Sequence, residues 1–136
     1  MTYLVDTHIL MWSFFEPERL SSDIQGILLD SRNIVYYSPV NLWEISIKYG
    51  LGKLTLNGLT PEAFFDELNR SFFICKDIKT SDIITSYKLP MRHKDPFDRL
   101  IIWEAIKNNI ILISADDTIL KYKDDGLNVV SLYEKI

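Results

Sequence analysis

Cysteine is almost missing from this sequence. Cys75 is the only cysteine among 136 residues, which excludes an intrachain disulfide and a cysteine-rich zinc site. A chain without disulfides is typical of a reducing compartment, so we expect a cytoplasmic location.

Signals for secretion and membrane insertion are missing as well. The N-terminus carries no basic region, and Asp6 interrupts its first apolar segment, which argues against a secretory signal. No apolar run is long enough to cross a bilayer, so we expect a soluble protein with no membrane partner.

Positive charge is in short supply. The sequence has 15 Lys and Arg against 19 Asp and Glu, a net charge of −4. This is the wrong sign for a protein that holds nucleic acid by bulk electrostatics. If this chain binds nucleic acid, something else must neutralise the phosphates.

The apolar content is sufficient for one hydrophobic core. Hydrophobic residues make up 47% of the chain, and we expect residues 1–136 to form a single domain. Short apolar runs predict strands over residues 3–5, 34–37, 72–75, 110–113 and 129–130. Helical patterns separate these runs, which implies crossover connections, a mostly parallel sheet and helices on both faces. The predicted fold is a three-layer α/β/α sandwich.

Caps and prolines predict where several helices begin. A capping side chain precedes a proline at three places, namely Ser38-Pro39, Thr60-Pro61 and Asp95-Pro96. We expect the helix from Pro39 to stop at Gly50 and Thr80 to cap another helix. Asn57-Gly58 predicts a loop or small hairpin.

Four acids fall where an open α/β sheet binds its ligands, which is beyond the carboxyl ends of the strands. They are Asp6, Glu44, Asp98 and Asp116. Like charges gathered at one edge raise each other's pKa and destabilise the fold unless a cation pairs them. Carboxylate oxygens without cysteine suit Mg²⁺ or Mn²⁺. We therefore predict that these four acids bind the metal and serve as the catalytic residues.

The segment "HKDPFDRLIIWEA" contains two aspartates with different predicted roles. Asp95 is the natural helix cap, accepting the backbone N–H of residue 97 or 98. Asp98 shares a helical face with Ile101 and Ile102, so it points toward the core side and needs a partner. The sequence thus assigns a structural role to Asp95 and a ligand role to Asp98.

Two roles are possible for several residues beside these acids. Thr7 and Ser114 either orient a ligand or cap a helix, and we favour the cap. A basic group beside the acids either contacts phosphates or pairs with the acids. Its members are Lys48, Arg92, His93, Lys94 and Arg99.

Four segments resemble the acidic motifs of PIN-domain proteins, particularly the ribonuclease toxins of VapBC-type toxin–antitoxin modules. They are "LVDTHILMW", "SPVNLWEISIKYGLGKL", "HKDPFDRLIIWEA" and "ILISADDTILKY", and together they span almost the whole chain. Carried over by position, the acids of the family fall on Asp6, Glu44, Asp98 and Asp116. The fourth motif reads Thr or Ser, any residue, then Asp, so Asp117 is the neighbour of the ligand.

The resemblance implies Mg²⁺- or Mn²⁺-dependent cleavage of single-stranded or structured RNA, inhibited by a cognate antitoxin protein. The metal would supply the positive charge that the chain lacks. The predicted helix over residues 8–15 is apolar nearly all round, which fits a homodimer or an antitoxin helix as a partner.

Three other functions compete with this interpretation. A metal-free ribonuclease would use His8 and His93 as acid and base. A phospho-receiver module would need its acceptor near Asp77 and paired acids after the first strand, where the sequence has only Asp6. A non-catalytic binding module would keep the acids for structure alone.

Overall fold

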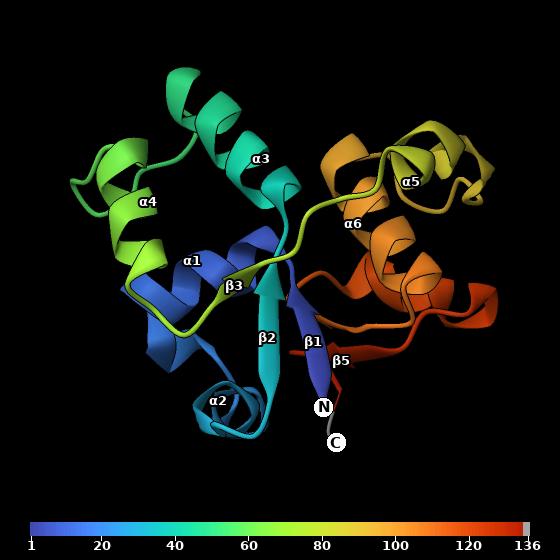
Figure 1. The fold of residues 1–136 in the computed structure, drawn as a ribbon, viewed down its shortest axis with the longest axis horizontal. Helices are drawn as coiled ribbons and strands as arrows, with labels where there is room; N and C mark the ends of the chain where they lie inside the picture. The colour runs from blue at the N-terminus through green and yellow to red at the C-terminus, as the bar shows by residue number, and fades with distance from the viewer. Residues whose placement is uncertain (135–136) are drawn as a thin grey trace.

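The computed structural model describes residues 1–134, and a five-stranded parallel sheet lies at its centre (Figure 1). The strands are β1 (Thr2–Val5), β2 (Ile34–Tyr37), β3 (Ile74–Cys75), β4 (Ile111–Ser114) and β5 (Val129–Ser131). Their order is β3-β2-β1-β4-β5, and every pairing is parallel. β1 is the middle strand, with Tyr3 opposite Val35 of β2 and Leu4 opposite Leu112 of β4.

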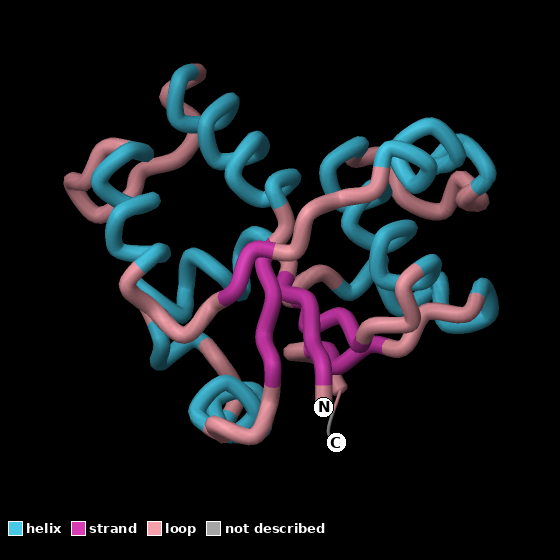
Figure 2. The backbone as a smooth tube through the Cα atoms, viewed as in Figure 1, coloured by secondary structure: helices cyan, strands magenta, loops and turns pink. Residues whose placement is uncertain are grey.

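Helices cover both sides of this sheet (Figures 1 and 2). One side carries α1 (Thr7–Phe15), η1 (Pro17–Arg19), α2 (Ser22–Leu29) and α4 (Pro61–Asn69). The other carries α5 (Thr80–Thr85), η2 (Ser86–Lys88), α6 (Pro96–Lys107) and the 3-10 helix η3 (Asp117–Asp125). The predicted α/β/α sandwich is confirmed. Within residues 1–134, no helix combines the length and apolar character needed to span a membrane.

The central strands bury both of their faces. Tyr3 and Val5 of β1 join a core with α1, α2 and α4, whereas Leu4 joins a second core with α6 and η3. Successive side chains of a strand point to opposite faces, so β1 has to be apolar at each of these positions. This explains why the sequence shows a continuous apolar run here.

Helix α3 (Pro39–Gly50) stands at the carboxyl end of the sheet and contacts both cores. Val40 packs in the core with α6, and Ile45 packs in the core with α1. The predicted cap is confirmed, because the Ser38 hydroxyl accepts the N–H of Val40 (3.1 Å) and Asn41 Oδ1 accepts the N–H of Ser38 (2.7 Å). α3 therefore holds Glu44 above the strand ends.

Two further local predictions are confirmed. Thr60 caps α4 by accepting the N–H of Ala63 (3.2 Å). Asn57 and Gly58 both have positive φ, 54° and 87°, and a bridge between Leu56 and Leu59 closes a tight hairpin around them. Positive φ at both central residues is the geometry that Asn-Gly favours.

Several boundary predictions are wrong. The strand predicted over residues 110–113 runs from Ile111 to Ser114. α3 includes Gly50, and the chain turns away at Gly52, whose φ of 71° lies in the left-handed region. Thr80 is the first residue of α5, and Lys79 occupies the cap position without a side-chain hydrogen bond. The third strand begins only at Ile74, because the N–H of Phe73 donates to the Ser71 hydroxyl (3.2 Å).

Glu104 of α6 is an unusual member of the core. Its side chain is fully buried, and neither carboxylate oxygen has a hydrogen-bond donor among residues 1–134. Burial raises the pKa of Glu104 above its ordinary value, and the charge of Asp82 adds to this shift, while Ser38 and Lys76 oppose it. Folding therefore favours the protonated form of this carboxyl group.

Replacing Glu104 with glutamine should stabilise the protein at neutral pH. Because the folded-state pKa is raised, the native state binds the extra proton, and wild-type stability falls as pH rises from about 4. Glutamine carries no charge that burial penalises, so we expect Glu104→Gln to raise the free energy of unfolding at pH 7.5. Urea denaturation at pH 5 and 7.5 measures this difference.

The increase in the free energy of unfolding should be smaller at pH 5, where Glu104 is closer to its protonated form. Exposed Glu62 of α4 provides the matched control, since Glu62→Gln removes the same charge without a burial effect. Equal stability of Glu104→Gln and wild type at both pH values would contradict the interpretation of Glu104 as a destabilising buried acid.

Candidate metal centre

Asp6 joins three structural elements at the carboxyl edge of the sheet. Its Oδ1 accepts the N–H of Ile9 (2.8 Å) and so caps α1. Its Oδ2 accepts the hydroxyl of Ser114 and the N–H of Ala115, both at 2.8 Å, at the end of β4. Burial raises the pKa of Asp6, and these three hydrogen bonds offset the shift only in part.

Glu44 is held from the opposite side by a hydroxyl. Thr7 Oγ1 donates to Glu44 Oε1, and the same hydroxyl accepts the amide of Asn41 (3.1 Å). Since Asn41 supplies the donor to Thr7, the single hydroxyl proton of Thr7 is directed at Glu44. The prediction that Thr7 is a cap is wrong, because Asp6 caps α1 and Thr7 orients a predicted ligand.

Lys48 lies one turn after Glu44 and forms an ion pair with Glu44 Oε2. Partial burial would lower the pKa of Lys48, but the hydrogen bond and charge of Glu44, together with Asp95 and Asp98, raise it above the ordinary value. Lys48 is therefore a cation that neutralises one of the four predicted site acids. Lys48 was predicted either to contact phosphates or to pair with the acids, and this contact is a pairing with an acid.

Asp98 lies in the first turn of α6, as predicted, and Asp95 caps that helix. Asp95 Oδ1 accepts the N–H groups of Phe97 (2.8 Å) and Asp98 (3.2 Å), so its predicted structural role is confirmed. Burial raises the pKa of Asp98 to about 7, and the charges of Asp95, Asp6 and Glu44 add to the shift. The neighbouring carboxylates thus favour the protonated form of Asp98, in addition to the larger effect of burial.

Asp116 follows β4 and begins η3. Its Oδ1 accepts the N–H of Thr118 (2.9 Å), and its Oδ2 lies 2.6 Å from His93 Nε2. Burial would raise the pKa of Asp116, but the hydrogen bonds from His93 and Thr118 hold it below its ordinary value. The favoured prediction that Ser114 is a helix cap is wrong, because Asp116 caps η3. The Ser114 hydroxyl accepts the N–H of Asp116 (3.0 Å) and donates to the predicted ligand Asp6.

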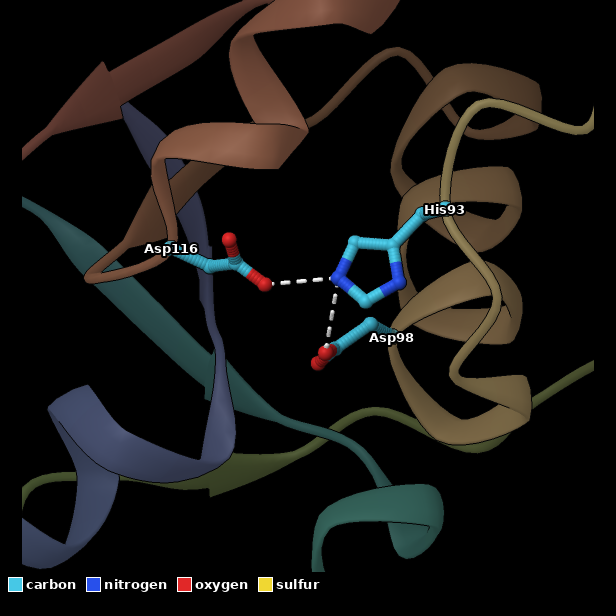
Figure 3. Close-up of side chains that lie close together, drawn as sticks. All are labelled: His93, Asp98 and Asp116. Atoms are coloured by element: carbon cyan, nitrogen blue, oxygen red, sulfur yellow. Dashed lines mark hydrogen bonds and ion pairs between the residues drawn. The ribbon is translucent and has the colours of Figure 1, made fainter.

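His93 lies between Asp98 and Asp116 (Figure 3). Its Nε2 is 2.6 Å from Asp116 Oδ2 and 3.2 Å from Asp98 Oδ2. Its Nδ1 accepts the backbone N–H of Asp95 (3.0 Å), so Nδ1 carries no proton in this arrangement. We therefore assign the proton to Nε2, which makes His93 the donor to Asp116, while Asp98 Oδ2 lies beside the same nitrogen.

Two of the four predicted ligands, Asp98 and Asp116, belong to one close group. Among the described residues, the only group of three potential ligands with donor atoms within 4.8 Å of one another is His93, Asp98 and Asp116. Asp6 and Glu44 are outside that group, although their charges act on Asp98. The arrangement offers closely spaced carboxylate oxygens, which suit a hard divalent cation.

The remaining basic residues mainly hold the loop before α6. Arg92 pairs with Asp125 (2.8 Å), and Arg99 donates to the carbonyl oxygens of Leu89 (2.8 Å) and Pro90 (3.0 Å). Lys94 is exposed and has no hydrogen bond or ion pair from its side chain within residues 1–134. The position of His93 between two acids was not predicted, since its place in the sequence indicated only a basic cluster.

Comparisons with known proteins agree with this architecture. The family model described as PIN domain matches residues 3–125. VapBC2 from Rickettsia felis, bound to a DNA fragment from their promoter, has a TM-score of 0.68 at 20% identity, covering 96% of this chain and 98% of that chain. VapBC-1 from nontypeable Haemophilus influenzae has a TM-score of 0.66 at 16% identity, covering 98% and 100%.

A toxin-antitoxin complex from Klebsiella pneumoniae has a TM-score of 0.58 at 19% identity, covering 98% of this chain and 99% of that chain. At these identities the structural matches establish the fold. The search of curated proteins gives no match to the sequence.

We expect the Thr7 hydroxyl to contribute to the stability of the folded protein. Thr7→Val keeps the shape of the side chain but leaves Glu44 Oε1 and the Asn41 amide without their shared partner. We expect a loss of about 1–3 kcal/mol in the free energy of unfolding, the cost of unpaired buried polar groups. Thr7→Ser keeps the hydroxyl and should lose less. Urea denaturation compares the three proteins, and a valine variant as stable as wild type would contradict the role of Thr7.

Proposed function

The chain belongs to the PIN-domain family, and from that premise we propose that it is a Mg²⁺- or Mn²⁺-dependent endoribonuclease. The observation that carries the proposal is the placement of Asp98 and Asp116, whose carboxylate oxygens lie within 4.8 Å of each other. Burial raises the pKa of Asp98 to about 7, and the charges of Asp95, Asp6 and Glu44 add to the shift. A divalent cation is the partner that would relieve this excess of negative charge.

The residues present fit such a cation. Asp98 and Asp116 offer carboxylate oxygens within 4.8 Å of each other, and we propose Asp6 and Glu44 as the further ligands. A donor set of oxygens without cysteine favours Mg²⁺ or Mn²⁺ over zinc. When bound, the cation would supply the positive charge that lowers the pKa of a water and stabilises the leaving oxygen of a phosphodiester.

The protein's own side chains would set the geometry for this chemistry. Ser114 and Ala115 fix Asp6, while Thr7 and Lys48 fix Glu44, so these carboxylates need little rearrangement on binding a substrate. Exposed Lys94 lies four residues before Asp98 and is available to contact an RNA phosphate.

We further propose that the chain is the toxin of a toxin–antitoxin pair and acts in the cytoplasm. The similar proteins of Rickettsia felis and Klebsiella pneumoniae are described as VapBC2 and a toxin-antitoxin complex. An apolar groove beside α1 and α2 is lined by Phe14, Leu20, Leu28 and half-exposed Phe72, which suits an apolar segment of an antitoxin.

A homodimer is the second proposed assembly. The α3 region exposes Trp43, Ile47 and Leu51 at intervals of four residues, which forms an apolar stripe on one face. An exposed stripe of this kind supports packing against a second copy of the chain.

The nuclease proposal is tested by Mn²⁺-dependent cleavage of a mixed RNA pool. Asp98→Asn should lower the cleavage rate by about 100-fold or more, because a ligand carboxylate is lost. Asp95→Asn is the matched control, since asparagine caps a helix about as well as aspartate and should keep most activity. A chelator should abolish cleavage by the wild type.

Folding of the Asp98→Asn variant can be checked independently. The pKa of Asp98 is raised in the native state, so its ionisation destabilises the metal-free fold as pH rises from about 4 toward 7. Asp98→Asn should therefore be at least as stable as wild type at pH 8. Chelator-resistant cleavage would favour the metal-free use of His8 and His93, and a folded protein that cuts no RNA would favour a binding module.

A further inference from the structure

His93 is the described residue whose Nε2 lies within 3.2 Å of both Asp98 and Asp116 in the candidate metal centre. We propose that His93 is a positioning residue of that centre, whose Nε2–H donor holds Asp116 in place beside Asp98 from outside the ligand set of the metal. This inference rests on the proposed metal-dependent function. It assigns a role that neither the acidic motifs nor the predicted basic cluster supplies.

The contacts of the imidazole argue against a direct ligand role. To bind a metal through Nε2, a neutral imidazole has to carry its proton on Nδ1. Nδ1 faces the backbone N–H of Asp95 at 3.0 Å, so the change would place two donors against each other. As a donor, in contrast, the ring satisfies both of its nitrogens at once, with the N–H of Asp95 on one side and the carboxylate of Asp116 on the other.

The backbone of His93 is fixed as firmly as its ring. The buried Tyr122 hydroxyl accepts the N–H groups of His93 (2.8 Å) and Arg92 (3.0 Å) and donates to the carbonyl of Pro90 (2.8 Å). Arg99 binds the carbonyls of Leu89 and Pro90 in the same loop. A residue that merely fills space would not require this number of polar contacts around its backbone.

The two carboxylates contact His93 in different ways. Asp116 Oδ2 accepts the Nε2–H (2.6 Å), and Asp116 also accepts the N–H of Thr118, whereas Asp98 Oδ2 lies 3.2 Å from the same Nε2. Without the imidazole, Asp116 Oδ2 would lose the donor that holds it beside Asp98. Outer partners of metal ligands typically contribute 10–100-fold to metal affinity, because they orient the ligand atoms before the ion arrives.

Two variants with side-chain amides of different length test this role. The terminal amide of glutamine extends about as far as the Nε2 of histidine, whereas that of asparagine ends near the position of Nδ1. We expect His93→Asn and His93→Ala to weaken Mn²⁺ binding by about 10–100-fold, and His93→Gln to recover most of the affinity. Free Mn²⁺ is measured by electron paramagnetic resonance in a titration at fixed pH.

His8→Ala removes the other histidine of the chain, which is exposed, and should leave the Mn²⁺ affinity near that of wild type. Pulsed electron paramagnetic resonance of the Mn²⁺-loaded wild type adds a direct readout. We expect no coupling of the strength produced by a directly coordinated ¹⁴N. A strong ¹⁴N coupling that disappears in His93→Gln would overturn the positioning role and make His93 a ligand.

The outcomes separate this inference from the proposed function. If the wild type binds Mn²⁺ and all His93 variants bind it equally well, the positioning role is wrong and the metal centre stands. If the wild type binds no Mn²⁺, the metal centre itself is wrong, and the positioning role falls with it. Thermal unfolding of His93→Asn and His93→Gln checks that both are folded, and equal affinity of this pair would also contradict the proposal.

Discussion

The concentration of carboxylates at one edge of a parallel sheet is the constraint on which the rest of this structure depends. Parallel strands end at the same edge, so the acids that follow β1 and β4 meet there, and α3 and α6 bring two more. Each acid then needs donors. Asp6 receives three hydrogen bonds and Glu44 receives a hydroxyl and an ammonium group, whereas Asp98 Oδ2 lies 3.2 Å from an imidazole that donates to Asp116. Burial raises the pKa of Asp98, and the charges of the neighbouring acids add to the shift.

Several of these donors are backbone N–H groups of helices that begin at the acids. Asp6 caps α1, Asp116 caps η3, and Asp98 lies in the first turn of α6. The N-terminal end of a helix presents unpaired N–H groups and a partial positive charge, which stabilises a nearby carboxylate. The N-terminal ends of several helices thus lie at the cluster and stabilise its carboxylates. The proposed cation would bind the negative charge that remains.

The sequence predicted those features that depend on contacts between near neighbours. Asp95 caps residues two and three positions ahead, and Asn57-Gly58 closes its own turn, so both are readable from a short segment. The alternation of apolar runs likewise predicted the sandwich. Gly50 and Thr80 show the limit of this reasoning, because either residue type is compatible with a place just inside or just outside a helix, and packing decides the final turn.

The role of a site residue was harder to predict when its partner is distant in the sequence. Thr7 finds Glu44 at a separation of 37 residues, and His93 finds Asp116 at a separation of 23. Nothing in the local sequence distinguishes a hydroxyl that caps from one that orients an acid, since both sit at a strand end. Only the packing of α3 against α1 decides which occurs. The acids themselves were easier to locate, because the topology alone brings them to one edge.

The two aspartates of "HKDPFDRLIIWEA" illustrate how structure and site share the same few atoms. The side chain of Asp95 begins α6 and thereby sets the direction in which Asp98 points. The backbone N–H of Asp95 binds His93 Nδ1 and thereby places the proton of the imidazole on the side of Asp98 and Asp116. One residue outside the acid cluster therefore orients both a carboxylate and the donor that faces it. Asp95 thus orients residues of the site, although it is not itself a proposed ligand.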